Sequence, residues 1–204
     1  MGKKQTFQGV RPAGRSSAVR EAVLAATLRT LIADGYAALS VEAVASRAGV
    51  NKTTVYRRWA TRDDLLADAL ATWSQEAIPI PDTGSVDTDM LALGGALAEQ
   101  LNGGVGQQVA AAMLAASHRS QQLREATRNF FDQQRVRATP LVRRAVERGE
   151  LPSDTDVDAL LTTFRAPFFY RVVTTGDLID EHLITQAAHV ALTAARAGVL
   201  SAQN

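Results

Sequence analysis

The twenty residues SVEAVASRAGVNKTTVYRRW, from Ser40 to Trp59, restrict the fold more than any other part of the chain. Ser40 can cap a first short helix, and Asn51 can cap a second one that runs from about Lys52 to Trp59. Gly49, between the two helices, predicts a tight turn. Two short helices joined by a glycine-containing turn are typical of a helix-turn-helix.

The second helix of this motif is predicted to have an apolar side and an outward polar side. Val55 and Trp59, four residues apart, should pack against the preceding helices. Short hydroxyl side chains followed by a guanidinium suit the floor of a DNA major groove, where Thr can contact a thymine methyl and Arg can hydrogen-bond guanine. The expected contacts with bases or DNA backbone are Lys52, Thr53, Thr54, Tyr56, Arg57, Arg58 and Arg62. The alternative is an ordinary charged helix face that contacts only water.

The charge distribution favours contact with a polyanion. Residues 1–62 hold 11 basic and 3 acidic side chains, a net charge of +8, whereas the rest of the chain holds 11 basic and 18 acidic ones, a net charge of −7. The basic third of the chain therefore indicates nucleic-acid binding, and the acidic remainder indicates a different task.

The remaining sequence predicts an all-α protein with no metal site and no cofactor. Strand-favouring runs are scarce, and there is no cysteine for a disulfide or a thiolate ligand. The three histidines are too scattered for a metal cluster. No apolar segment approaches a membrane span or a secretory signal, so we expect a soluble, cytoplasmic protein without membrane contact.

Breaks in the apolar periodicity divide the chain into three parts. Residues 1–15 are expected to form a flexible basic arm, 16–62 a helix-turn-helix DNA-binding domain, and 63–204 a second helical domain. Gly35 should end the first helix. Pro140 and Pro167 should kink or divide their helices. The expected helices are 16–35, 40–48, 52–59, 65–78, 86–102, 105–117, 120–149, 154–176 and 180–198.

The segment from Arg20 to Leu70 resembles the DNA-binding region of the tetracycline-repressor (TetR) family. The matching stretches are DGYAALSVEAVASRAGV, NKTTVYRRW and LLADAL. The resemblance implies an operator-binding homodimer whose C-terminal bundle binds a small-molecule effector, and a fourth helix that shifts when the effector binds. It also places Ser40 and Lys52 at DNA phosphates. Thr53 and Arg58 depart from the glycine and histidine common at these positions, which affects base preference.

The two predicted C-terminal helices are candidates for a dimer interface. The 154–176 helix is apolar over more than one side, so we expect it to be buried by its own domain and by a partner chain. Two such helix pairs would form a four-helix interface with twofold symmetry. The residues expected there are Phe169, Val172, Val173, Leu183, Ile184, Ala188, Ala191, Leu192 and Ala195. Burial in the core of a single chain is the alternative.

The helices between residues 86 and 176 are expected to surround a ligand cavity with a mostly apolar lining. This composition favours a hydrophobic effector. The candidate lining residues are Met90, Leu97, Leu101, Met113, Leu114, Ser117, His118, Phe130, Gln134, Phe164 and Phe168. A residue of this kind is more often plain core than a ligand contact, and a histidine among apolar neighbours, such as His118, is more often structural.

The sequence therefore predicts a ligand-responsive transcriptional repressor that binds double-stranded DNA. Two alternatives stay open. One is a nonspecific nucleic-acid-binding protein that uses only the basic third of the chain. The other is an enzyme that uses the C-terminal pocket, but the sequence shows no nucleophile with paired carboxylates, no phosphate-binding loop and no metal-ligand spacing.

Overall fold

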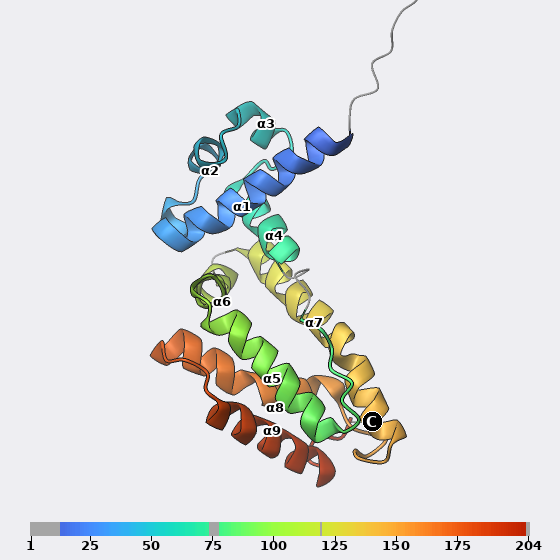
Figure 1. The fold of residues 1–204 in the computed structure, drawn as a ribbon. Helices are drawn as coiled ribbons and strands as arrows, with labels where there is room; N and C mark the ends of the chain where they lie inside the picture. The colour runs from blue at the N-terminus through green and yellow to red at the C-terminus, as the bar shows by residue number, and fades with distance from the viewer. Residues whose placement is uncertain (1–12, 74–77, 119, 203–204) are drawn as a thin grey trace, which may run out of the picture.

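The computed structural model describes residues 13–73, 78–118 and 120–202, and within them the fold is all-α, as predicted (Figure 1). A single bridge between Thr155 and Ser201 is the only β-type pairing among these residues. Most of the predicted arm and residues 74–77 of the predicted 65–78 helix lie outside the described residues. The helices are α1 Ala13–Ala38, α2 Val41–Ala48, α3 Lys52–Tyr56, α4 Arg62–Trp73, α5 Val86–Asn102, α6 Gly104–Ser117, α7 Gln121–Glu147, α8 Val157–Tyr170, the π-helical turn η1 Arg171–Thr175, and α9 Glu181–Arg196.

Helices α1–α4 form an N-terminal group around one apolar cluster. Val23, Val44, Val55 and Leu65, one from each helix, are completely buried in it. The cluster continues into α6 and α7 through Val109, Met113 and Leu123. The N-terminal group therefore shares its core with two helices that come much later in the chain.

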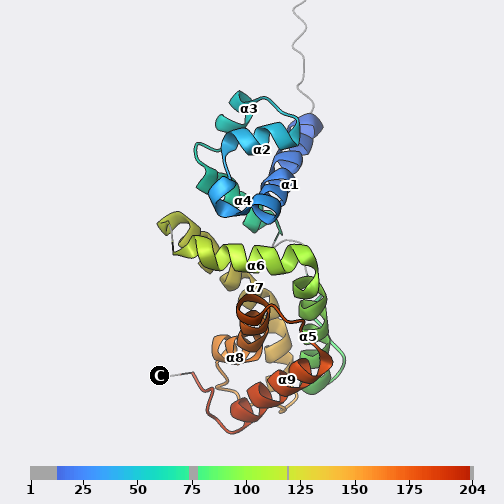
Figure 2. The same cartoon turned by 90° about the vertical axis from the view of Figure 1, so that its left-hand side faces the viewer.

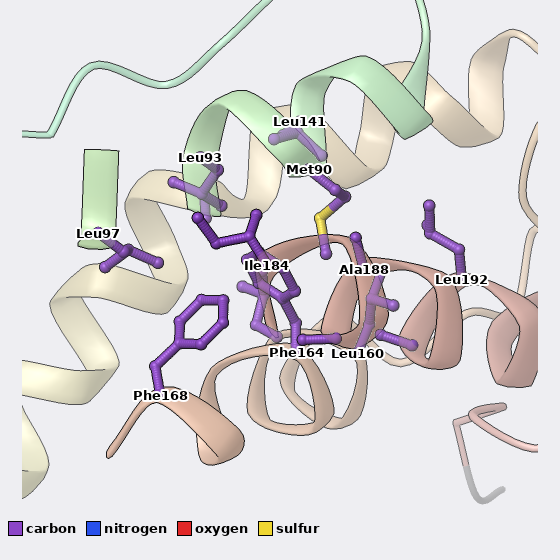
Figure 3. Close-up of a cluster of buried hydrophobic side chains, with 14 of the residues drawn as sticks. Met90, Leu93, Leu97, Leu141, Leu160, Phe164, Phe168, Ile184, Ala188 and Leu192 are labelled. Carbon is purple, nitrogen blue, oxygen red and sulfur yellow. The ribbon is translucent and has the colours of Figure 1, made fainter. Parts of the chain in front are cut away.

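Helices α5, α8 and α9 form the centre of a C-terminal group around a second apolar cluster, to which α7 also contributes (Figure 3). Figure 3 shows Met90 and Leu93 of α5 above Phe164 of α8, with Ile184 and Ala188 of α9 beside them. All five side chains are buried. The apolar periodicity of each helix accounts for this packing, because one face of each turns toward the same centre.

Two helices connect the two groups. Helix α6 lies between the N-terminal group and α5, α8 and α9 (Figure 2), and α7 runs from the end next to α4 along the length of the C-terminal group (Figure 1). Both helices contribute buried residues to the N-terminal cluster and to the C-terminal cluster. A displacement of α6 or α7 therefore alters the packing of both groups.

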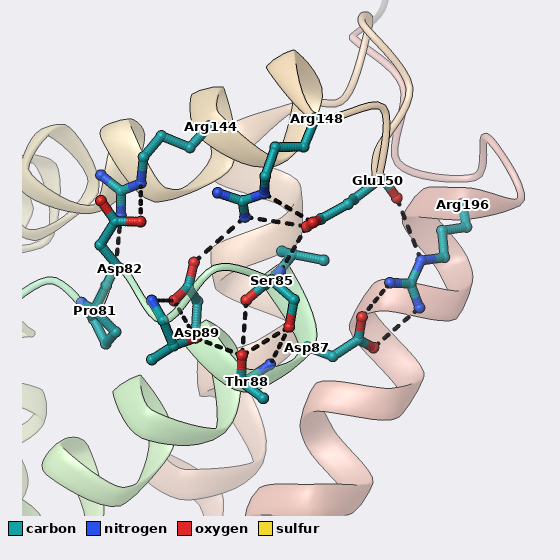
Figure 4. A network of polar contacts seen from close by, with 12 residues as sticks. Pro81, Asp82, Ser85, Asp87, Thr88, Asp89, Arg144, Arg148, Glu150 and Arg196 are labelled. Carbon is teal, nitrogen blue, oxygen red and sulfur yellow. Dashed lines mark hydrogen bonds and ion pairs between the residues drawn. The ribbon is translucent and has the colours of Figure 1, made fainter.

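A polar network fixes the start of α5 against the ends of α7 and α9 (Figure 4). The completely buried Asp89 accepts hydrogen bonds from the backbone N–H and the hydroxyl of Thr83, at 2.6 and 2.8 Å, and lies 3.6 Å from Arg148. Asp87 pairs with both terminal nitrogens of Arg196, at 3.2 and 2.6 Å. Acidic groups in the first turn of α5 also favour its positive dipole end.

Two local predictions need correction. Helix α3 ends at Tyr56 and not at Trp59, because its last turn tightens: the N–H groups of Arg58 and Trp59 both bond the carbonyl of Val55, at 2.9 and 3.0 Å. Helix α7 continues through Pro140 and helix α8 continues through Pro167, so neither proline divides its helix. Burial of Ala138 and Leu141 on either side of Pro140 stabilises α7 against the lost hydrogen bond.

Candidate nucleic-acid interface and central cavity

The helix-turn-helix is built by three local devices that the sequence predicted. Ser40 caps α2, accepting a 3.1 Å bond from the N–H of Ala43. Gly49 takes the left-handed conformation (φ 67°) at the end of α2. Asn51 caps α3, accepting a 3.0 Å bond from the N–H of Thr53. These caps fix the angle at which α3 leaves the turn.

The outward face of α3 is available for contact with another molecule. Val55 and Trp59 are buried at 0 and 5 % exposure, so the opposite side of the helix faces water. Lys52, Thr53 and Arg57 are exposed there and Thr54 is half-buried. The side chain of Arg57 forms no hydrogen bond or ion pair with any residue that the structure describes, and its guanidinium is free to bind an external acceptor.

Tyr56 lies beside this face and is held by α2. Its hydroxyl donates a 2.8 Å hydrogen bond to the Glu42 carboxylate. This bond lowers the pKa of Glu42 and raises the pKa of Tyr56. Contact of the Tyr56 hydroxyl with a phosphate would therefore have to replace the bond to Glu42, an acid whose involvement the sequence analysis missed.

Arg58 and Arg62 already have partners within the chain. Arg58 donates to the hydroxyl of Ser16 at 2.9 Å. Arg62 lies over the Tyr36 ring, 4.5 Å from its centroid, with Asp63 at 3.9 Å. The pKa of Tyr36 is raised, first by burial and then by its hydrogen bond to Asp63. Arg62 therefore has an aromatic and an acidic partner within its own chain.

A set of aromatic rings lines three adjoining hollows in the second part of the chain. Trp73 stacks on Phe130 at 5.9 Å between centroids, and Phe131 meets Phe130 and Phe169 edge to face at 5.1 and 5.4 Å.

The three hollows differ in size and lining. The inner hollow, about 30 Å³, lies among Trp73, Leu101, Met113, Phe130 and Arg165. The α6 hollow, about 280 Å³, is lined by Met113, Leu114, Ser117, Thr127 and Tyr170, among others. The α8 hollow, about 230 Å³, is lined by Arg135, Asp158, Leu161, Thr162 and Arg165, among others. Phe131 and Phe169 line all three.

Comparison with known proteins agrees with this arrangement. The family model described as "Bacterial regulatory proteins, tetR family" matches residues 23–69, and the model of the tetracyclin repressor-like C-terminal domain matches residues 80–191, which is more than half of the chain. The chain belongs to the TetR family. It is accordingly a DNA-binding, helix-turn-helix transcriptional regulator.

The similarity to other TetR-family proteins extends over nearly the whole chain. The transcriptional regulator AqdR of Rhodococcus erythropolis is 32 % identical, over 91 % of this chain and 89 % of that protein. The DNA-binding transcriptional repressor TetR of Mycobacteroides abscessus is 31 % identical, over 87 % of this chain and 94 % of that protein. The crystal structure of the TetR-family regulator SCO0332 has a TM-score of 0.69 and 28 % identity, over 86 % of this chain and 97 % of that one.

The residues expected to line the ligand cavity of this TetR-family chain fall into three groups. Leu97, Leu101, Met113, Phe130 and Gln134 line the inner hollow, and Leu114 and Ser117 line the α6 hollow. Met90, Phe164 and Phe168 are completely buried in the C-terminal cluster (Figure 3) and line none of the three hollows. His118 is exposed and lines none of them either, so it is neither a core histidine nor a wall residue.

The residues expected at the dimer interface lie mostly inside a single chain. Seven of the nine are buried in the C-terminal cluster: Val172, Leu183, Ile184, Ala188, Ala191, Leu192 and Ala195. Phe169 lines the hollows and Val173 the α6 hollow. The apolar stripe of α9 packs on α5 and α8 of its own chain, and the dimer interface expected from these residues stays a prediction.

Sequence reasoning missed several wall residues, among them Trp73, Phe131 and Arg165. Arg165 carried a signal, because it is the single cation in the sequence of α8 and lies between Phe164 and Ala166. Among the described residues, no three His, Asp or Glu side chains gather as ligands for a metal ion. None of the helices described has the length and apolarity that a membrane crossing requires.

Proposed function

We propose that this TetR-family regulator is a repressor that binds a palindromic operator as a homodimer and is released by a small effector with an apolar body. In this proposal residues 16–62 bind DNA, residues 63–204 bind the effector and the partner chain, and the protein acts on chromosomal DNA in the cytoplasm. The observation that carries it is the outward face of α3, where Lys52, Thr53 and Arg57 are exposed above a buried Val55.

The proposed roles on DNA follow from the contacts of each side chain. Thr53, Thr54 and Arg57 read base edges, because they lie on the outward side of α3 and the side chain of Arg57 has no partner among the described residues. Ser40, Lys52 and Tyr56 contact phosphates. Arg58 and Arg62 support the fold through Ser16 and Tyr36 and contribute positive charge near the backbone.

The proposed dimer interface is the outward face of α8 and α9. One recognition helix touches few bases, and a second half-site supplies the missing affinity. Exposed residues of α8 and α9 include Thr162, Ala166, Thr185 and Val190. Val190→Glu should make the protein monomeric in analytical ultracentrifugation and weaken operator binding. Val136→Glu, which changes a valine at another exposed helical position, on α7, is the control and should do neither.

The proposed release mechanism uses contacts between the hollows and the N-terminal group. Met113 lines two hollows and belongs to the N-terminal apolar cluster, and Trp73, the last residue of α4, forms part of the inner wall. An effector that fills this space would therefore press on α4 and α6. Release requires that it bind the DNA-free arrangement more tightly than the DNA-bound one.

Selection of bound duplexes from a random library, followed by footprinting, tests the DNA-binding part of the proposal. We expect a palindrome whose half-sites are protected together. Arg57→Ala should relax preference at one position of each half-site by about 1–3 kcal/mol. The matched control Arg29→Ala removes an exposed arginine from α1 and should leave base preference unchanged.

Salt-dependent binding without a preferred duplex would favour the alternative of a nonspecific nucleic-acid-binding protein. A purified protein that remained monomeric at working concentrations would contradict the dimer.

A further inference from the structure

Neither the packing of the fold nor DNA binding accounts for the positive charge of Arg165. This residue projects from α8 between the inner hollow and the α8 hollow, and it borders both. Its side chain is half-buried, and its Nε is completely buried without a hydrogen-bond partner among the described residues. A buried, unpartnered N–H of a charged group is costly, so its persistence in a cavity wall calls for an explanation.

The acid closest in sequence and space does not neutralise Arg165. Asp158 lines the α8 hollow, but it is exposed, and within the described residues its ion pair is with Arg135, at 3.9 Å. Burial lowers the pKa of Arg165 to about 10, and Asp158 opposes this only in part. The guanidinium therefore stays protonated at neutral pH, and the wall keeps a positive charge.

The rest of the inner wall is uncharged. Gln100 and Gln134 are its other polar side chains, and the remainder is apolar or aromatic, including Trp73, Phe130 and Phe131; no carboxylate belongs to it among the described residues. A molecule that fills the inner hollow thus meets one cation, Arg165, and several aromatic rings. Neutral apolar molecules would leave the charge of the Arg165 guanidinium unpaired, whereas an anion would pair with it.

We propose that the effector is a small apolar monocarboxylate whose carboxylate pairs with Arg165 and whose body lies among Trp73, Phe130, Phe131 and Met113. This inference rests on the proposed function, because it names the chemical class of molecule bound at the same cavity.

The space for such a molecule lies in the three hollows, which adjoin one another at the rings of Phe131 and Phe169. Each hollow alone is below the roughly 300–1,000 Å³ usual for a ligand site, but Phe131 and Phe169 line all three of them. Phe131 is 37 % exposed, so its ring is less restrained than a core phenylalanine. Met113, Phe131 and Phe169 line both the inner hollow and the α6 hollow, so rotation of the Phe131 ring would join the two spaces.

Calorimetric titration with matched acid and amide pairs tests the proposal on the wild-type chain. The probes are decanoate against decanamide and naphthoate against naphthamide, which differ in charge and hardly in shape. At least one acid should bind at least about tenfold more tightly than its amide, the factor that one charge-assisted hydrogen bond contributes. Equal affinity within both pairs, or no binding of either acid, would overturn it.

Variants of Arg165 show whether this side chain is responsible. Arg165→Met should weaken binding of the acid at least about tenfold and leave the amide unchanged, and Arg165→Lys should retain part of the preference. Without any probe, Arg165→Met should also raise the melting temperature, because a buried charge without a partner is removed. The control Arg128→Met makes the same change of charge at an exposed position of α7 and should alter none of these.

Failure of this inference is separable from failure of the proposed function. A protein that footprints a palindrome but is released only by neutral or cationic molecules would refute the carboxylate and leave the repressor intact. If Arg165→Met does not fold, the comparison of acids with amides on the wild-type chain still tests whether the cavity prefers a carboxylate. A tight acid that is insensitive to Arg165→Lys and Arg165→Met would place the carboxylate elsewhere and contradict the proposal.

Discussion

Asp64 links the start of α4 to the start of α7. Its carboxylate accepts hydrogen bonds from the N–H and the hydroxyl of Thr61, both at 2.8 Å, and from the side-chain amide of Gln122 at 2.5 Å. The N–H of Asp64 in turn donates to the Thr61 hydroxyl at 3.1 Å, which completes a reciprocal cap of α4. The Gln122 hydrogen bond is the largest cause of a lowered Asp64 pKa, followed by the Thr61 hydroxyl.

A lowered pKa makes the contribution of Asp64 to stability depend on pH. The stabilisation is fully present above the ordinary pKa of 3.8 and is lost as the pH falls through the lower folded value. We expect Asp64→Ala to reduce the free energy of unfolding by less than about 1 kcal/mol at pH 7, because water screens this site. Urea titrations should show a difference between the two proteins that shrinks steadily as the pH falls below 3.8. A difference that did not change with pH in this acidic range would show that the charge is not responsible.

Single residues show where sequence reasoning succeeded and where it stopped. The caps at Ser40 and Asn51 were predictable because a cap depends on neighbours within three residues. The position of Arg62 over Tyr36 depends on residues 26 positions apart, and periodicity carries no information about such a pair. The roles proposed for Lys52, Thr53 and Arg57 remain predictions until DNA binding is measured.

At the scale of helices, α9 packs so closely on α5 that one α5 position requires glycine. A methyl group built on Gly94 would lie 2.5 Å from Cγ2 of Ile184 and 3.1 Å from Cζ of Phe164. Both neighbours are buried, and the β-branched Ile184 has little rotamer freedom. The next residue, Gly95, has no atom within 4 Å of the same built position.

These adjacent glycines predict opposite effects of the same substitution. Gly94→Ala should destabilise the protein by about 1–2 kcal/mol, because overpacking of about 1–3 kcal/mol exceeds the gain of up to about 1 kcal/mol in helix propensity. Gly95→Ala should stabilise it by about 0.5–1 kcal/mol. Urea unfolding at one protein concentration measures both. Stabilisation by Gly94→Ala would mean that α9 does not pack on α5 as closely as described.

Helix α9 also shows why a buried stripe could be predicted but not its partner. The spacing of Leu183, Ile184, Ala187 and Ala191 predicts one buried face, and the structure has it. Whether that face meets its own chain or another chain depends on the position of α5, which the periodicity of α9 does not contain. In α7, likewise, the packing of Leu141 against the C-terminal cluster outweighs the local effect of Pro140.

At the scale of the whole molecule, α7 belongs to both apolar clusters. Leu123 near its start is completely buried in the N-terminal cluster, and Leu141 near its end is completely buried in the C-terminal one. A continuous helix that anchors both clusters couples their unfolding, because neither cluster can lose α7 without exposing apolar surface of its own. The same continuity would carry an effector's influence from the hollows to α4.

We therefore expect one cooperative unfolding transition, to which both leucines contribute alike. In a Trp73→Phe background, Trp59 is the remaining tryptophan and reports on the N-terminal cluster. Leu123→Ala and Leu141→Ala should each lower the free energy of unfolding measured by Trp59 fluorescence by about 2–4 kcal/mol. Val136→Ala, at an exposed position of the same helix, should change it by less than about 0.5 kcal/mol. If Leu141→Ala left the Trp59 transition in place while circular dichroism split into two steps, the groups would unfold independently, and α7 could not transmit an effector signal through shared packing.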